Sequence, residues 1–164
     1  MSASNFQQII THLAESHVEY IVIGGLAATI HGSAYVTYDV DICYERSLAN
    51  VTRLCQMLDP LHPVLRDAPG DLPFHIDPRS VLAGMNITLS TDLGAIDLLG
   101  EVSPFGAFAA VLPFTETAEL FGHHVRILSL EGLIKAKQAT GRRKDLLVLP
   151  ELEALLELRK RSPL

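Results

Sequence analysis

The chain has 164 residues, of which 48% are hydrophobic and 20% are charged, and its formal net charge is −6. A domain of this length buries roughly 70% of its unfolded surface, so it can form a core without disulfides. The acidic balance argues against nonspecific binding of duplex DNA, which needs a surplus of Lys and Arg. No apolar run reaches the roughly 20 residues of a membrane helix. The N-terminus also lacks the basic residues of a secretory signal. We therefore expect a single cytoplasmic domain over residues 1–164, with no membrane association.

Hydrophobic periodicity predicts the elements of the first part of the chain. The strand at 20–23 is β-branched and apolar and ends in Gly24-Gly25, and the strand at 38–44 alternates between apolar and polar residues. Ser47 is a helix cap before an apolar period. The expected elements are a helix over about 4–15, a strand at 20–23, a short helix at 26–31, a strand at 38–44 and a helix from 48.

The rest of the chain is less regular. Five prolines without an apolar period between residues 59 and 79 predict a long loop. Strands at 86–90 and 95–99 are joined as a hairpin, a further strand is expected at 125–128, and Ser129 caps a helix that Gly141 ends. In the last helical region, Pro150 either breaks the helix or begins its final part. The chain is thus α/β (α+β), a small mixed β-sheet flanked by helices, with a C-terminal helical part over about 129–160.

Three aspartates carry the candidate chemistry. Asp39 and Asp41 lie on one face of their strand, roughly 7 Å apart along the backbone. Asp97 lies in the middle of an apolar strand. Carboxylates held close together in a half-buried place are costly unless a cation neutralises them, and magnesium prefers oxygen ligands. Judged on these residues alone, a solvated face with structural hydrogen bonds is an equally good interpretation.

Gly24-Gly25 favours the metal interpretation. The pair lies where a buried strand turns into a helix, which leaves backbone N–H groups free for phosphate. A glycine pair on its own more often serves tight packing. Because this pair follows a buried strand and precedes a D-x-D strand, it predicts a phosphate-binding turn beside the carboxylates.

The main cationic cluster is C-terminal and comprises Lys135, Lys137, Arg142, Arg143 and Lys144. Such a cluster near a helix end is usually only solvated. Lys137, however, falls on the apolar face of its helix and can therefore reach inward to an anion. Asp145 is expected to pair with a neighbouring Arg. Histidines and cysteines show no zinc spacing, and the phosphate-binding motifs of P-loop and Rossmann proteins are absent from the sequence.

Together these motifs resemble a minimal nucleotidyltransferase of the DNA polymerase beta superfamily, over nearly the whole chain. The residues that carry the resemblance are Gly24-Gly25, His31-Gly32, Thr37, Asp39-Val40-Asp41 and Gly94-Ala95-Ile96-Asp97. The segments 133–137 and 141–145 are also similar to the bacterial branch related to abortive-infection (AbiEii-type) toxins. Two positions depart from the pattern: Tyr35 stands where members often have Arg, and Gly25 where many have Ser.

The resemblance implies a role for each residue. Asp39 and Asp41 would bind two Mg²⁺ ions, with Mn²⁺ as an alternative, and Asp97 would complete one metal site and help to deprotonate the acceptor hydroxyl. A second group would bind the nucleoside triphosphate: Gly24, Gly25, Thr37, Lys137, Arg142 and Lys144.

The expected function is magnesium-dependent transfer of a nucleoside monophosphate from a nucleoside triphosphate to a hydroxyl of a protein, an RNA or a small molecule. The alternative is a catalytically weak module that binds a nucleotide or a partner protein, as in a toxin–antitoxin pair.

Overall fold

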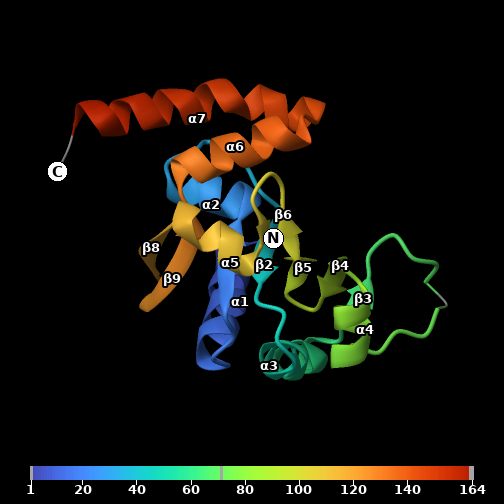
Figure 1. Cartoon of the computed structure of the whole chain (residues 1–164). Coiled ribbons are helices and arrows are strands. Elements are labelled where there is room, and N and C mark those ends of the chain that lie inside the picture. The colour runs from blue at the N-terminus through green and yellow to red at the C-terminus, as the bar shows by residue number, and fades with distance from the viewer. Residues whose placement is uncertain (1, 71, 163–164) are drawn as a thin grey trace.

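A seven-stranded mixed sheet organises the chain (Figure 1). The computed structural model describes residues 2–70 and 72–162, apart from the side chain of Ser4. The strands of this sheet are β1 (Tyr20–Ile23), β2 (Asp39–Tyr44), β3 (Val64–Leu65), β4 (Asn86–Thr91), β5 (Gly94–Leu99), β8 (Thr115–Leu120) and β9 (His123–Leu128). Their order is β3-β4-β5-β2-β1-β9-β8, in which the pairs β2–β5 and β1–β9 are parallel. β6 (Glu101–Val102) and β7 (Gly106–Ala107) form a separate small ribbon.

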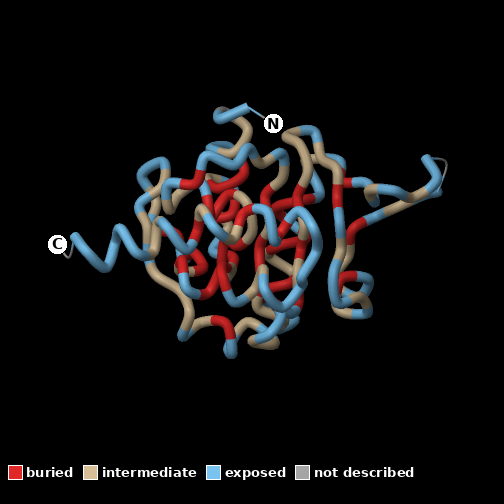
Figure 2. The backbone as a smooth tube through the Cα atoms, turned by 90° about the horizontal axis from the view of Figure 1, so that it is seen from above, coloured by how far each residue is buried: buried red, intermediate tan, exposed pale blue. Residues whose placement is uncertain are grey.

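The helices are α1 (Ala3–Glu15), α2 (Gly24–Ile30), α3 (Leu48–Leu58), α4 (Pro78–Ala83), α5 (Phe108–Val111), α6 (Leu130–Thr140) and α7 (Arg143–Arg161), with short 3-10 turns at Asp59–Leu61 and Leu112–Phe114. Figure 1 shows α6 and α7 together on one side of the molecule and α3 with α4 on the other. Buried residues run through the central strands and the inner faces of the helices (Figure 2). Within the described residues, no helix combines the length and apolarity needed to cross a bilayer.

The fold class expected from the sequence, a mixed sheet flanked by helices, is confirmed. Ser47 and Ser129 cap α3 and α6 through their side chains, and Gly141 ends α6 in a left-handed conformation, as predicted. α2 starts earlier than expected, because Gly24 and Gly25 form its first turn rather than a turn before it.

The described residues of segment 59–79 are mostly loop, as predicted, although they include the short edge strand β3, which pairs with β4. One local expectation is wrong. Pro150 neither breaks nor begins a helix, because α7 runs continuously through it. A proline inside a helix leaves the carbonyl four residues earlier without its partner. That residue here is Leu146, which is exposed, so water can satisfy the carbonyl.

Candidate active site

Asp39, Asp41 and Asp97 converge on one point of the sheet. In the parallel pair β2–β5, Asp41 is the direct partner of Asp97, and Asp39 lies two residues before Asp41 on the same face. One oxygen from each of the three carboxylates lies within 4.8 Å of the other two. The placement of Asp39 and Asp41 on one face, predicted from strand parity, is therefore confirmed, and the pairing of β2 with β5 adds Asp97 to them.

Gly24 lies directly against this cluster, and Gly25 lies against Thr37. A Cβ atom on Gly24 would lie 2.0 Å from an oxygen of Asp41, and one on Gly25 would lie 2.7 Å from the Thr37 hydroxyl. Gly24 also has a φ of 64°, which other residues rarely adopt. Gly24 therefore turns the chain after β1 and gives the Asp41 carboxylate the space that a side chain at residue 24 would occupy.

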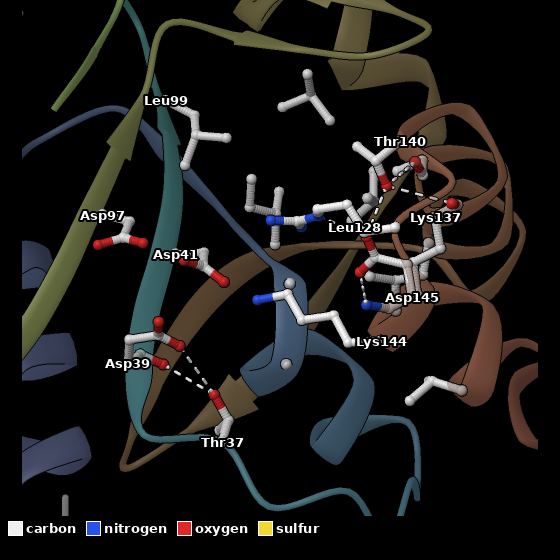
Figure 3. Close-up of a pocket in the computed structure, with 18 of the residues that line it drawn as sticks. Thr37, Asp39, Asp41, Asp97, Leu99, Leu128, Lys137, Thr140, Lys144 and Asp145 are labelled. Atoms are coloured by element: carbon white, nitrogen blue, oxygen red, sulfur yellow. Dashed lines mark hydrogen bonds and ion pairs between the residues drawn. The ribbon is translucent and has the colours of Figure 1, made fainter. Parts of the chain in front are cut away.

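Thr37 holds Asp39 from the loop before β2. Its hydroxyl lies 3.1 Å from the backbone carbonyl of Asp39 and 3.2 Å from Asp39 Oδ1, as Figure 3 shows. Thr37 was expected to face the nucleotide. It does line the cavity described below, but the contact that its hydroxyl makes orients a carboxylate.

A cavity of about 470 Å³ separates the carboxylates from the C-terminal cations. Lys137, Arg142 and Lys144 all line it, and Figure 3 shows Lys137 and Lys144 across the cavity from Asp41. Tyr35 lines the same cavity and is 46% exposed, so no cation is contributed from that position. The three cations that the sequence assigned to phosphate binding are thus brought together with the three aspartates.

Asp145 fixes the position of two cations on this side of the cavity, Lys137 and Arg142. Its side chain is only 3% exposed and accepts hydrogen bonds from Arg142 Nε at 2.7 Å, the Thr140 hydroxyl at 2.9 Å and Lys137 Nζ at 3.3 Å. Burial alone would raise the pKa of Asp145, but these three donors outweigh it and hold the pKa below its usual value. The expected pairing of Asp145 with an Arg is confirmed, and Lys137 takes part in the same network.

The carboxylate cluster has the opposite electrostatics. Burial, reinforced by the charges of Asp39 and Asp97, raises the pKa of Asp41 to about 7. Burial also raises the pKa of Asp97, although the Arg66 guanidinium opposes that shift. The carboxylates repel one another when they are ionised, and a bound cation would relieve this repulsion.

Arg66 is the residue of this site that sequence reasoning missed. It follows the two-residue strand β3, and its Nη2 donates a hydrogen bond to Asp97 Oδ1, while its Nη1 lies 3.9 Å from Asp39 Oδ2. A two-residue strand has no detectable periodicity, so the proline-rich segment gave no signal that Arg66 would reach the carboxylates. In the sequence, Arg66 is marked only as a cation that directly follows two apolar residues.

The residues present fit a divalent cation. Three carboxylates supply hard oxygen ligands at close range, and they line a cavity with room for a ligand that the ion would share. The cationic wall opposite suits a ligand that carries several negative charges.

No family model and no curated protein matches the sequence. Solved structures do match it. A protein from Thermotoga maritima assigned as a nucleotidyltransferase is 14% identical with a TM-score of 0.58, covering 92% of this chain and 94% of its own. The lincosamide antibiotic adenylyltransferase LnuA with bound lincomycin is 12% identical with a TM-score of 0.65 and coverages of 94% and 98%. The antibiotic-resistance factor ANT(2'')-Ia is 14% identical with a TM-score of 0.57 and coverages of 96% and 91%. The chain therefore has the nucleotidyltransferase fold.

Proposed function

We propose that the protein is a magnesium-dependent nucleotidyltransferase that moves a nucleoside monophosphate from a nucleoside triphosphate to a hydroxyl group. The observation that carries this proposal is the meeting of Asp39, Asp41 and Asp97 within 4.8 Å of one another on one wall of a cavity whose opposite wall is cationic. An anionic substrate with its own metal ion fits between two such walls.

The chain's own residues have separate tasks in this reaction. Lys137, Arg142 and Lys144 hold the triphosphate from the C-terminal helices, and Gly24 and Gly25 let its phosphates approach the backbone closely. Thr37 keeps Asp39 oriented. Asp39 and Asp41, completed by Asp97, would hold Mg²⁺, which neutralises the charge that builds up on the reacting phosphate.

The chemical step forms one bond and breaks another. The acceptor oxygen attacks the α-phosphorus, the bond from that phosphorus to the bridging oxygen of the β-phosphate breaks, and pyrophosphate leaves. The acceptor hydroxyl loses its proton to Asp97, the partner of Asp41 on the neighbouring strand β5. The lincosamide antibiotic named for the structural neighbour LnuA favours a small-molecule acceptor over a protein or an RNA.

A non-transferring nucleotide sensor is the second candidate. It is favoured by Tyr35 at a position where related enzymes carry Arg, and by the engagement of Lys137 and Arg142 with Asp145. A toxin-related protein that acts with a partner protein would be a case of this second candidate. Only the similarity of segments 133–137 and 141–145 supports that branch.

Transfer of label distinguishes the two candidates. The protein is incubated with α-³²P-labelled nucleoside triphosphates, Mg²⁺ and total cell extract, beside Asp39→Asn and the control Asp92→Asn, whose carboxylate is 60% exposed at the distant β4–β5 turn. The enzyme and the control should label the same acceptor, and Asp39→Asn should not. If nucleotide binds but no acceptor is labelled with any of the four nucleotides, the protein is a sensor.

A further inference from the structure

The backbone places Arg66 in register with the two partnered carboxylates. β3 pairs with β4 through Val64–Ser90 and Leu65–Leu89, and the Arg66 amide continues the ladder by donating to the Thr88 carbonyl at 2.9 Å. Thr88 is in turn the partner of Asp97. Residues in one cross-strand row share a face of the sheet, so Arg66 projects toward the face that carries Asp97 and Asp41.

The guanidinium is anchored as well as paired. Besides its contact with Asp97, Nη2 donates to the Leu89 carbonyl at 3.1 Å, and only 27% of the side chain is exposed. The buried Nε has no hydrogen-bond partner among the residues that the structure describes. A side chain fixed by a backbone carbonyl is a permanent part of the site rather than a surface cation in passing contact.

Arg66 divides the cluster into two unequal sides. Its positive charge lies against Asp97 and Asp39, whereas Asp41 faces the bare Gly24 and receives no contact from Arg66 among the described residues. An ion that shared the Asp97 oxygen held by Nη2 would displace a hydrogen bond and lie close to another cation. Among the described residues Asp41 makes no contact with Arg66, so an ion held through Asp41 would leave the hydrogen bond between Arg66 and Asp97 in place.

We infer that the Arg66 guanidinium takes the place of a second metal ion at Asp97, so that the site binds one divalent ion with its nucleotide rather than two. This inference rests on the proposed function, because it concerns the same carboxylates, and it revises the two-ion expectation drawn from the sequence. Arg66 is thus a positioning residue that supplies the charge of one cation and sets the metal stoichiometry.

The test counts ions directly with Mn²⁺ in place of Mg²⁺. Electron paramagnetic resonance distinguishes an isolated Mn²⁺ from a pair about 3.5–4 Å apart, whose spins are coupled. The full-length protein is titrated with Mn²⁺ in the presence of a nonhydrolysable nucleoside triphosphate analogue. The wild type should show one isolated ion per chain. Arg66→Gln should show a coupled pair, its second ion binding at least tenfold more tightly than any second ion of the wild type.

Two further variants control for charge and for folding. Arg66→Lys keeps the cation and should keep the single ion, whereas Arg79→Gln removes an exposed Arg in α4 and should change nothing. Circular dichroism confirms that each variant is folded. A coupled pair in the wild type, or an isolated ion in both the wild type and Arg66→Gln, overturns the inference and leaves the proposed function standing. No protein-bound Mn²⁺ in any variant overturns both.

Discussion

Asp41 and Asp97 are direct partners in the parallel pair β2–β5, with the bare backbone of Gly24 pressed against the Asp41 carboxylate. This arrangement makes the position of Asp41 depend on the absence of a side chain at residue 24. It also explains why a glycine pair and a D-x-D strand occur together in the chain.

Gly24→Ala should therefore weaken ligand binding by a steric route. The added Cβ would lie 2.0 Å from Asp41 Oδ2 and push the carboxylate away. We expect magnesium–nucleotide affinity to fall roughly 10- to 100-fold, the usual effect of disturbing what orients a metal ligand. Gly122→Ala is the matched control, because Gly122 also has a positive φ but no atom within 4 Å of its added Cβ. Both variants should lose about 1–2 kcal/mol of stability from backbone strain. Equal binding by the two variants in calorimetric titration would contradict the steric account.

Lys137→Ala should weaken triphosphate binding without unfolding the protein. A hydrogen bond to a charged group contributes about 1.5–3 kcal/mol, which corresponds to roughly a 10- to 100-fold loss of affinity. The fold should persist because Arg142 and Thr140 still satisfy Asp145. Lys135→Ala, on the same helix but over the Phe114 ring, is the control. If titration of both variants with a nonhydrolysable nucleotide and Mg²⁺ gives wild-type affinity, Lys137 serves only Asp145.

In chelator, the pH dependence of the protein's unfolding free energy should reflect the titration of Asp41. The folded-state pKa of this group is raised to about 7 by burial and by the neighbouring carboxylates, from an unfolded value of 3.8. A carboxyl group whose pKa is higher in the folded than in the unfolded protein stabilises the fold at pH below its unfolded pKa. This contribution is lost as pH rises to its folded pKa. The difference in unfolding free energy between wild type and Asp41→Asn should therefore fall as pH rises between these two values and level off above pH 7. Urea denaturation at several pH values measures this difference. A difference that is flat across the window would show that Asp41 is ionised in the folded protein.

Metal and nucleotide should reverse the ranking of the same two proteins. In chelator at pH 8, Asp41→Asn should be as stable as the wild type or slightly more stable, because it removes one of three repelling carboxylates. At a hundredfold excess of magnesium–nucleotide over the dissociation constant, the wild type should gain about 2.7 kcal/mol. This gain is roughly a 5–10 °C rise in melting temperature for a chain of this size. Asp41→Asn should lose most of the rise, since an amide is a poorer magnesium ligand. Strong destabilisation of Asp41→Asn in chelator, with no response of either protein to ligand, would make Asp41 a structural hydrogen-bond acceptor.

The sequence predicted the parts of the site that local patterns determine. Strand alternation placed Asp39 and Asp41 on one face, and an apolar period placed Lys137 on the inner face of its helix. Arg66 escaped prediction because its position depends on the register between β3 and β4, which is set by pairing between segments distant in sequence. The interpretation of Pro150 was wrong because tertiary context can outweigh local propensity. Proline is disfavoured inside a helix, but α7 packs on α6 and the residue whose carbonyl loses its partner is exposed, so the helix continues.

The central claim is that the three aspartates bind a metal ion together with a nucleoside triphosphate. The most direct measurement is a crystal structure of the protein with Mn²⁺ and a nonhydrolysable nucleoside triphosphate, in which anomalous scattering locates the metal. The account predicts one manganese peak at the cluster of Asp39, Asp41 and Asp97, with the triphosphate between that ion and Lys137. A triphosphate bound elsewhere, or no manganese at the carboxylates, would contradict it.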